Sequence, residues 1–304
     1  MVTVLAPTPL LTIDVEKGSS GADDLHIHIG GQGVWVARMA TALGAKVCLC
    51  CALGGETGNV LRHLLEAEPI ELKVAYTEAA SGGWVEDRRA DDVHCLADMP
   101  GEPLPRHAAD DLFTLTLAHA LDHGVCVLTG VPDERQLAPQ FFGRLTSDLI
   151  TNGCRVVVDL HGAALEQAVG AAPTVVTIND EQMAEIGLAA SAEPDDLGRG
   201  IRALNDSGIA CVVVSRGSEP ALAGFDGGLY AVTPPRLEAT ETRGTGDSMT
   251  GALGAALDRQ MSMLDAVRLA VAAGAVNVTR RGLGTGGGEP VNLLVDHVTV
   301  EELR

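Results

Sequence analysis

The chain contains few aromatic and few basic residues for its length. Of its 304 residues only 3% are aromatic, and 21 Lys and Arg stand against 41 Asp and Glu, so the formal net charge is −20. A surface with this charge repels nucleic acids and anionic membranes, and we expect neither as a partner. It also repels anionic small molecules at long range, so any phosphate site must be built locally.

Long apolar runs and a basic leader are missing as well. No apolar run in the sequence reaches the roughly 18 residues that a membrane-spanning helix needs. The first 14 residues contain no Lys or Arg and already include Asp14, which differs from a secretory signal. We therefore expect a cytoplasmic protein.

The seven cysteines do not follow a disulfide or metal-binding pattern. Their number is odd, and Cys48, Cys50 and Cys51 lie in one apolar run, where successive side chains of a strand face opposite ways. We interpret the cysteines as reduced core thiols. His26 and His28 share one face of a short predicted strand, and we interpret them as surface or interface residues instead of metal ligands.

Beyond residue 109 the chain alternates regularly between apolar and amphipathic segments. Apolar strands without alternation are typical of a mostly parallel sheet that helices cover on both faces, so we predict an α/β fold in one domain, 1–304. Strands are expected at 2–6, 46–53, 125–129, 155–159, 174–178 and 210–215, a hairpin at 221–232, and helices at 34–43, 59–67, 109–123, 136–152, 162–169, 180–186, 195–206 and 264–280.

The segment 71–99 differs from the rest, because it alternates in short stretches and has no helical pattern. The alternating stretches are 72–76, 83–88 and 93–97. Together with 25–29, we predict that they form a small antiparallel sheet that acts as a lid over the site. Few predicted helices are near enough to cover this sheet, so we predict a homodimer through it.

One glycine-rich stretch, 242–253, has the composition of an anion site. Gly244 and Gly246 leave backbone N–H groups uncovered at the positive end of a predicted helix. Asp247 lies at the same end, where a carboxylate suits a general base that takes a proton from an attacking hydroxyl. Arg243 could balance the charge that develops. The alternative is that Asp247 only caps or charges the start of the helix.

A second glycine-rich segment, Gly30 to Gly33, also follows a predicted strand and opens a helix. A dinucleotide-binding fingerprint is therefore an alternative interpretation. However, the third glycine position of that fingerprint, counted from Gly31, is Val36, and the preceding strand alternates histidine with aliphatic residues. We therefore do not favour a dinucleotide dehydrogenase.

These motifs resemble those of the ribokinase-like, PfkB carbohydrate kinase family, and above all its 1-phosphofructokinase and tagatose-6-phosphate kinase branch. The C-terminal signature is Arg-Gly-Thr-Gly-Asp-Ser-Met at 243–249, and the N-terminal one is Gly-Gly-Gln-Gly-Val-Trp-Val-Ala-Arg at 30–38. Asp14 and the segment 157–165 match as well. The resemblance implies a three-layer ribokinase-like fold and an ATP-dependent, Mg²⁺-requiring kinase that phosphorylates a hydroxyl of a sugar or sugar phosphate.

The resemblance also implies roles for individual residues. Around the transferring phosphoryl group it implies the base Asp247 and an anion hole made of Gly244, Thr245 and Gly246. Asp14 and Gly31 would hold hydroxyl groups of the acceptor. Along the nucleotide it implies Ser215, Arg216, Gly217 and Asn277. The Asn-x-x-Glu motif that organises magnesium and phosphate would begin at Asn179, with Glu181 as a neighbouring carboxylate.

Several residues depart from the family pattern. In the acceptor-binding segment, Gln32 stands where the family has lysine, and Trp35 where it has asparagine. Leu10 replaces an asparagine ahead of Asp14, and Gln182 replaces the glutamate of Asn-x-x-Glu. The lost charge and the added ring predict an acceptor other than fructose 1-phosphate, either neutral or with a flat or apolar part.

Arg88 argues in the opposite direction, because a cation on the predicted lid could bind an anionic acceptor. Two further functions stay open at this point. One is the same chemistry on a nucleoside or another non-sugar alcohol. The other is a nucleotide- or metabolite-binding protein with little turnover.

Overall fold

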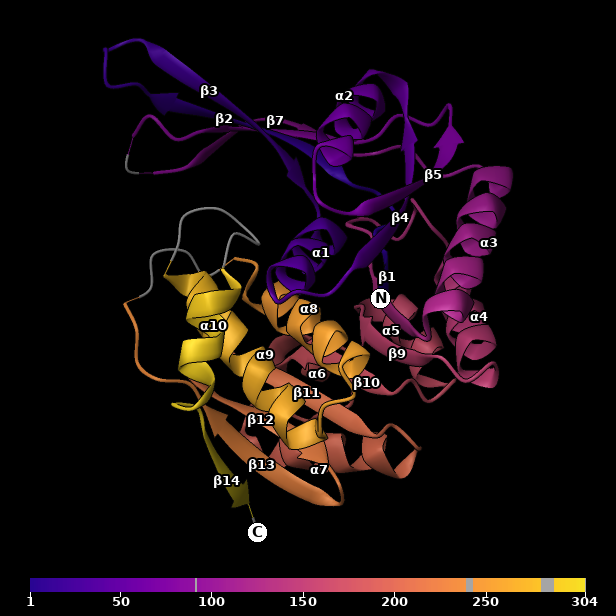
Figure 1. The fold of residues 1–304 in the computed structure, drawn as a ribbon, viewed down its shortest axis with the longest axis vertical. Coiled ribbons are helices and arrows are strands. Elements are labelled where there is room, and N and C mark those ends of the chain that lie inside the picture. Colours follow the sequence, from indigo (N-terminus) through magenta and orange to yellow (C-terminus); the bar gives the residue numbers. More distant parts are fainter. Residues whose placement is uncertain (91, 239–242, 280–286, 304) are drawn as a thin grey trace.

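The computed structural model describes residues 1–90, 92–238, 243–279 and 287–303 (Figure 1). Within them a ten-stranded sheet forms the centre of the molecule. The seven strands from β11 to β5 run parallel, and the last three at the other edge are antiparallel. In spatial order the strands are β14 (Thr299–Leu303), β13 (Gly228–Thr233), β12 (Glu219–Phe225), β11 (Cys211–Arg216), β10 (Val175–Asn179), β9 (Arg155–Asp159), β8 (Val125–Thr129), β1 (Val2–Leu5), β4 (Val47–Gly54) and β5 (Glu71–Thr77).

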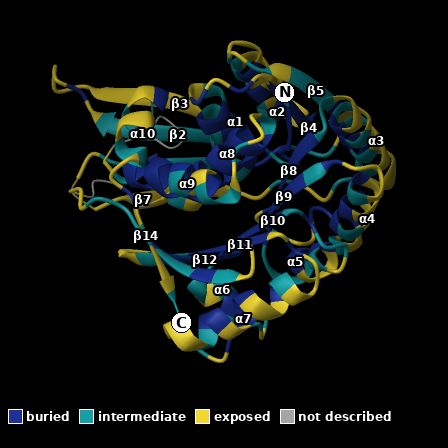
Figure 2. Ribbon diagram, turned by 60° about the horizontal axis from the view of Figure 1, so that its bottom comes forward, coloured by how far each residue is buried: buried dark blue, intermediate teal, exposed yellow. Residues whose placement is uncertain are grey.

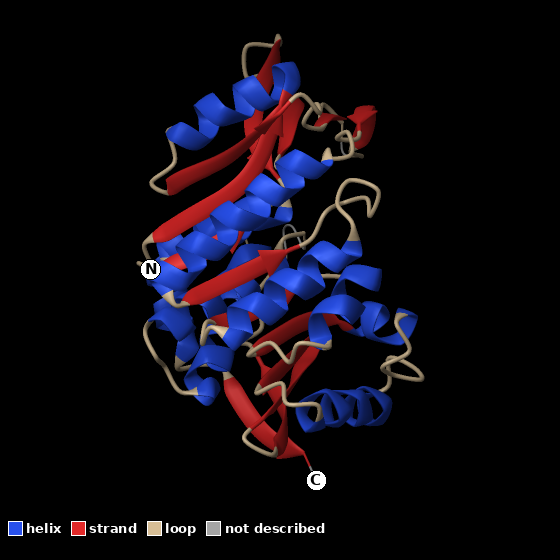
Figure 3. Ribbon diagram, turned by 90° about the vertical axis from the view of Figure 1, so that its right-hand side faces the viewer, coloured by secondary structure: helices blue, strands red, loops and turns tan. Residues whose placement is uncertain are grey.

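Helices cover both faces of this sheet, as Figures 1 and 3 show, and two separate apolar clusters form the core between the layers. This arrangement confirms the predicted three-layer α/β fold. One face carries α1 (Gln32–Ala42), α2 (Gly55–Glu66), α8 (Thr245–Asp258), α9 (Met263–Val278) and α10 (Gly288–Val295). The other carries α3 (Arg106–His123), α4 (Pro139–Thr151), α5 (Gly162–Val169), α6 (Asp180–Glu185) and α7 (Pro194–Asp206).

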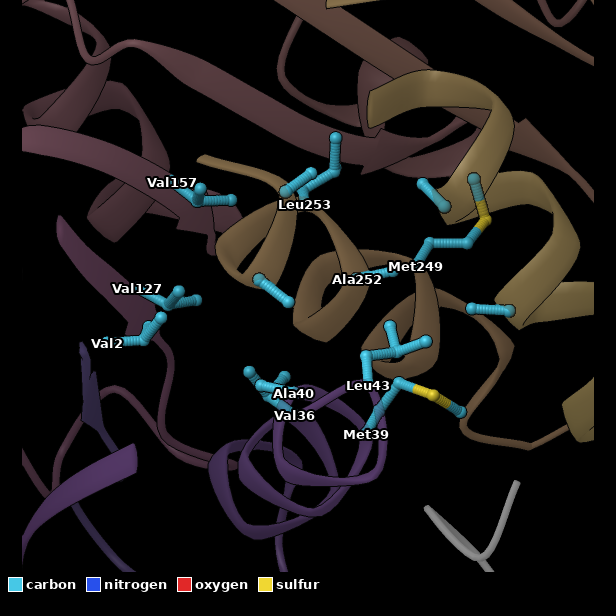
Figure 4. Packing of buried hydrophobic residues seen from close by; sticks show 14 of the residues in the cluster. Val2, Val36, Met39, Ala40, Leu43, Val127, Val157, Met249, Ala252 and Leu253 are labelled. Carbon is cyan, nitrogen blue, oxygen red and sulfur yellow. The ribbon is translucent and has the colours of Figure 1, made fainter. Parts of the chain in front are cut away.

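Helices α1 and α8 pack closely against each other (Figure 4). Val36 and Met39 of α1 lie against Gly251 of α8, and they share one buried cluster with Met249 and Leu253. The helices can approach because residue 251 is glycine: a Cβ there would lie 2.5 Å from the carbonyl oxygen of Val36. The contact holds together the two helices that follow the two glycine-rich segments.

The predicted helices and strands match the structure closely from residue 125 onward, where β8, β9 and α5 have the expected bounds. Near the N-terminus α2 begins at Gly55, four residues earlier than predicted, because the helix follows β4 directly and Gly54, the last residue of that strand, is its N-cap. The C-terminal α10 and β14 were not predicted. Among the described residues, none of the helices combines the length and apolar content of a membrane crossing.

A separate four-stranded sheet, hereafter the lid sheet, stands apart from the main sheet (Figure 1). Strand β2 is central in it, antiparallel to β3 and parallel to β6, while β6 and β7 are antiparallel. The sheet is therefore mixed, and not purely antiparallel as predicted. Its strands, in spatial order, are β3 (Asp23–Gly30), β2 (Leu10–Lys17), β6 (Gly83–Asp87) and β7 (His94–Met99).

The prediction that 72–76 belongs to the lid is wrong. These residues lie in β5, which pairs parallel with β4 at the edge of the main sheet. Alternation marks any strand with one covered face, so it does not distinguish an edge strand of the main sheet from a lid strand. The helix α2 between β4 and β5 makes the crossover that a parallel pair requires.

The two faces of the lid sheet differ in polarity, because side chains alternate along each strand. One face carries Ile13, Leu25 and Ile27, and on β3 the latter two are 65% and 51% exposed. Figure 2 shows how exposed β3 is along most of its length. The opposite face carries Asp14 and Glu86, which are register partners on β2 and β6.

Six of the seven cysteines and the paired histidines occupy the expected environments. All seven cysteines are free thiols, and six are buried; Cys95 on β7 is exposed. His26 and His28 are about half exposed on the polar face of the lid sheet, where they lie near Glu16 and Asp14.

Candidate active site

The site lies where the order of the main sheet reverses. From β1 the chain continues outward to β4 and β5, whereas β8 to β11 extend on the other side of β1. Ligands in such sheets bind beyond the carboxyl ends of the strands at this switch point. A pocket of 130 Å³ lies there, formed mainly by residues after β1, at the start of α1 and after β8. Its lining consists of Ala6, Pro7, Thr8, Pro9, Gly31, Gln32, Gly33, Val34, Thr129, Gly130, Val131, Pro132 and His161.

The first turn of α8 has an open N-terminus. Gly244 precedes the helix with a φ of 76°, a left-handed conformation that glycine adopts without strain. Thr245, Gly246 and Asp247 follow as the first helical residues. A Cβ at Gly246 would meet no other atom within 4 Å, so the space beside this turn is open. Backbone N–H groups at such an end attract anions.

Asp247 shares the site with a second carboxylate, that of Asp159 at the end of β9. Thr250, one turn after Asp247, donates a hydrogen bond of 2.6 Å to Asp159 Oδ2. The Gln32 side chain lies with both carboxylates, and its Oε1 accepts the Gly130 N–H at 3.1 Å. Because Oε1 is used in this way, the amide NH₂ group is the one available to the carboxylates.

Burial raises the pKa of both carboxyl groups. Burial brings the pKa of Asp159 to about 6, although hydrogen bonds from Thr250 and Gln32 lower it. The pKa of Asp247 lies well above its usual value because of burial first and then the negative charge of Asp159, while Gln32 lowers it. As whole residues, Asp159 and Asp247 are both intermediate between buried and exposed. A carboxylate with raised proton affinity near neutral pH suits general-base catalysis.

The raised pKa of Asp159 predicts that Asp159→Asn stabilises the ligand-free protein at pH 8. Because the folded-state pKa of about 6 exceeds the unfolded value, stability falls as pH rises between about 4 and 6. The destabilisation by ionised Asp159 is fully present at pH 8. There we expect Asp159→Asn to raise the free energy of unfolding by about 1–3 kcal/mol. Urea unfolding at pH 8 and pH 4 measures it, with the surface variant Asp148→Asn as control. An equal gain at both pH values would contradict the prediction.

A second cluster of charges lies between the lid sheet and the loop before α8. Glu86 on β6 has a side chain that is only 5% exposed. Its Oε1 accepts from Trp84 Nε1 at 2.9 Å and from Arg243 at 3.1 Å, and its Oε2 accepts from Arg88 Nε at 2.8 Å. Burial alone would raise the pKa of Glu86, but the hydrogen bonds from Arg243, Arg88 and Trp84 outweigh it and lower the pKa.

Asp14, on the neighbouring strand of the lid sheet, belongs to the same cluster. Its Oδ2 lies 3.7 Å from Arg88 Nε and 3.3 Å from His28 Nε2. Its Oδ1 is buried and has no hydrogen-bond partner among the described residues. The cluster therefore connects the predicted acceptor residues Asp14 and Arg88 to Arg243, whose carbonyl oxygen accepts from Asn277 Nδ2 at 2.7 Å.

The remaining residues predicted for the acceptor and anion sites differ in their relation to the pocket. Gly31 precedes α1 with a φ of 105° and lines the pocket next to Gln32. Trp35 is half-buried in α1 and is not among the lining residues. Thr242, the first residue of the predicted anion stretch, lies outside the described residues.

The predicted nucleotide residues lie at neighbouring strand ends. Asn179 and Ser215 are register partners at the ends of β10 and β11; Arg216 is the last residue of β11, and Gly217 begins the turn to β12. Asn179 caps α6, because its Oδ1 accepts from the Gln182 N–H at 2.7 Å while Gln182 Oε1 accepts from the Asn179 N–H at 3.2 Å. Gln182 thus has a structural role at the position where the family has glutamate.

Glu181, the other predicted metal residue, is exposed in the first turn of α6. Within the described ranges, no three His, Cys, Asp or Glu side chains are grouped as metal ligands. A metal site in this part of the chain would therefore combine at most two such side chains with other donors.

Sequence reasoning missed two carboxylates of the two clusters, Asp159 and Glu86. Asp159 was recognisable as a carboxylate at a strand end, but only its contact with Thr250 and Gln32 connects it to Asp247. Glu86 carried no signal of its own, because its position opposite Asp14 depends on the pairing of β2 with β6.

An open helix N-terminus binds phosphate, and a neighbouring carboxylate of raised proton affinity accepts a proton from a hydroxyl group. A doubly wound α/β fold that brings both together beneath a lid sheet is that of a phosphotransferase with an alcohol acceptor.

Comparison with known proteins agrees with this class. Residues 139–289 match the model of the pfkB family of carbohydrate kinases. The chain is 31% identical to the ATP-dependent 6-phosphofructokinase isozyme 2 of Escherichia coli, over 83% of this chain and 82% of that one. It is 25% identical to the 1-phosphofructokinase of Vibrio cholerae, over 100% and 97%.

Solved structures show the same fold. Phosphofructokinase-2 of Escherichia coli, in complex with potassium, superposes with a TM-score of 0.84 at 24% identity, over 97% of this chain and 98% of that one. The chain belongs to the pfkB family of carbohydrate kinases. It is thus a kinase, and neither a dinucleotide dehydrogenase nor a binding protein without turnover is favoured.

Proposed function

We propose that the protein transfers the γ-phosphoryl group of ATP to a hydroxyl group of a sugar or sugar-like acceptor, with Asp247 as the general base. The observation that carries the proposal is the position of Asp247 in the first turn of α8, beside the open space at Gly246. In this arrangement the N–H groups of the turn hold the transferring phosphoryl group while Asp247 takes the proton of the acceptor hydroxyl. Arg243 stands next to the turn and can offset the charge that develops.

We propose that ATP and Mg²⁺ bind along the carboxyl ends of β9, β10 and β11. Mg²⁺ in kinases is commonly held by one or two carboxylates together with the phosphates, and the side chains at these strand ends can supply such ligands. Asp159 is the carboxylate that suits this function, with Asn179 and Glu181 on the neighbouring segment. When bound, the ion neutralises charge on the phosphate oxygens. Ser215, Arg216, Gly217 and Asn277 are proposed to line the nucleotide.

For the acceptor we propose the pocket at Gln32 together with Asp14. The unpartnered, buried Oδ1 of Asp14 supports this, because a hydroxyl group of a sugar would supply its missing hydrogen bond. The relatives carry the names of phosphofructokinases, so a sugar or sugar phosphate is the first acceptor class to test. A nucleoside or another alcohol with an apolar part is the second, because Pro7, Pro9 and Val131 line the pocket.

The direct test is a product assay. We expect that purified protein with ATP and Mg²⁺ converts at least one member of a panel of hexoses, hexose phosphates, pentoses and nucleosides to a compound heavier by one phosphate group. Mass spectrometry of the products identifies it. The failure of every class to yield such a product, with intact folded protein, would contradict the proposed function.

We also propose a homodimer through the apolar face of the lid sheet. Leu25 and Ile27 are 65% and 51% exposed there, although they are large aliphatic residues, and burial against a second copy would remove this surface from water. We expect light scattering to give twice the chain mass of 31.4 kDa for the wild type. Ile27→Glu should give the mass of one chain.

The matched control for the dimer is His26→Gln, on the opposite face of the same strand. This variant should remain a dimer, because its side chain faces away from the apolar surface. A wild type that is monomeric at micromolar concentration, or an Ile27→Glu variant that is still dimeric, would show that the lid sheet is not the interface.

A further inference from the structure

The buried carboxylate of Glu86 has a position that the kinase chemistry does not explain. It lies on the face of the lid sheet that meets the loop before α8, and it receives hydrogen bonds from Trp84, Arg88 and Arg243. Arg88 also places its Nη2 atom 2.7 Å from Glu86 Oε2, so two nitrogens of this guanidinium group meet one carboxylate oxygen. Two guanidinium groups that could bind an anion in the acceptor region are thus occupied by a carboxylate of the protein itself.

The charges in this cluster cancel. Arg88 and Arg243 are positive, while Glu86 and Asp14 are negative and stand side by side as register partners on β6 and β2. A phosphate group that bound Arg88 at Nε and Nη2 would have to displace Glu86, and would then stand close to the carboxylates of Glu86 and Asp14. A phosphate group and neighbouring carboxylates repel each other, and this repulsion discriminates against a charged ligand.

The pocket beside Gln32 offers no compensating cation. Among the described residues that line it there is neither lysine nor arginine, and His161 is the one side chain that can carry a positive charge. The remainder of the lining is largely proline, valine, threonine and glycine. Hydroxyl groups and apolar carbon can be accommodated there, whereas a dianion finds no charged partner.

We propose that Glu86 is a specificity-determining residue that takes the place of an acceptor phosphate group, so that the acceptor is an uncharged sugar or polyol. The inference rests on the proposed kinase function and names the acceptor class of the same site. Glu86 holds Arg88 and Arg243 in position for hydroxyl groups and excludes phosphate esters. Asp14, with its open Oδ1, is then left to accept a hydrogen bond from an acceptor hydroxyl.

The test compares each free sugar with its phosphate ester in the wild type and in Glu86→Gln. Glutamine keeps the volume and can still accept from Trp84, but it removes the charge. We expect wild type to favour free fructose over fructose 6-phosphate by at least about 10-fold in kcat/KM or, if neither turns over, in affinity by calorimetry. In Glu86→Gln the kcat/KM (or affinity) for the phosphate ester, divided by that for the free sugar, should rise by about 10- to 100-fold.

The matched control is Asp87→Asn, which removes the same charge from the next residue of β6. Asp87 pairs with Arg89, to which it lies within 2.7 Å, and not with Arg88 or Arg243. We expect this variant to leave the ratio unchanged. If Glu86→Gln does not fold, the wild-type preference alone decides.

A wild type that prefers fructose 6-phosphate, or a folded Glu86→Gln with an unchanged ratio, would overturn the proposal. These outcomes can be told apart from a failure of the kinase function. A wild type that phosphorylates only sugar phosphates, in a way that depends on Asp247, supports the kinase and overturns the inference on Glu86. Absence of any phosphorylated product overturns the kinase, while calorimetry still tests Glu86.

Discussion

Replacing Asp247 by asparagine lowers kcat by roughly 10²–10⁴-fold, the range expected for the loss of a general base, and leaves ATP binding nearly unchanged. Asparagine has the shape of aspartate but no basicity. The physical reason lies in the site: burial and the neighbouring Asp159 give Asp247 a raised pKa, and the acceptor hydroxyl must lose its proton there. Steady-state kinetics with the acceptor found in the product assay, and calorimetry with ATP, measure the two effects.

The control for Asp247 is Asp258→Asn, at the other end of the same helix. Asp258 pairs with the amino group of Met1 at 2.5 Å, so this variant changes stability but should leave kcat unchanged. If Asp247→Asn keeps full turnover on the true acceptor, the carboxylate only charges the start of α8.

Replacing Gly246 by alanine should lower kcat by about 10²-fold without any loss of stability. The methyl group meets no atom of the protein within 4 Å, and alanine is favoured over glycine in a helix by about 1 kcal/mol. The methyl group instead enters the open space beside the first turn of α8, where the transferring phosphoryl group is proposed to lie. A misplacement of about 1 Å is enough for an effect of this size.

Thermal unfolding and steady-state kinetics on the same preparation of Gly246→Ala test this prediction. The control is Gly170→Ala at the end of α5, where φ is −59° and the nearest atom, Gln167 O, is 3.6 Å from the new methyl group. This variant should keep both stability and kcat. An unchanged kcat for Gly246→Ala would mean that the phosphoryl group does not bind beside this turn.

Patterns local in sequence were sufficient for most of the fold. Apolar strands with intervening amphipathic helices predicted the parallel sheet, and β8, β9 and α5 have the predicted bounds because strand and helix periods are properties of short segments. The lid was predicted only in part. Alternation placed 72–76 in the lid, whereas β5 pairs with β4, because a strand's partner depends on the path of the chain around it.

Position 32 illustrates the same limit within the site. The sequence showed only that a neutral residue, Gln32, stands where the family has lysine. The structure shows its amide oriented by the Gly130 N–H and facing two carboxylates. The interpretation of Arg88 changed more. The sequence predicted a cation on the lid that could bind an anionic acceptor, whereas in the structure Arg88 is bound to Glu86.

The residues themselves determine the chemistry at the start of α8, because Gly244, Gly246 and Asp247 lie within four positions of one turn and need no distant partner to form an anion site beside a carboxylate. Tertiary structure alone decides what surrounds that turn. Asp159 reaches it through the order of the main sheet, and Glu86 through the pairing of β2 with β6. The physical reason is that charge, burial and hydrogen bonding act across space. The proton affinity of Asp247 therefore depends on side chains that the chain brings near only when it folds.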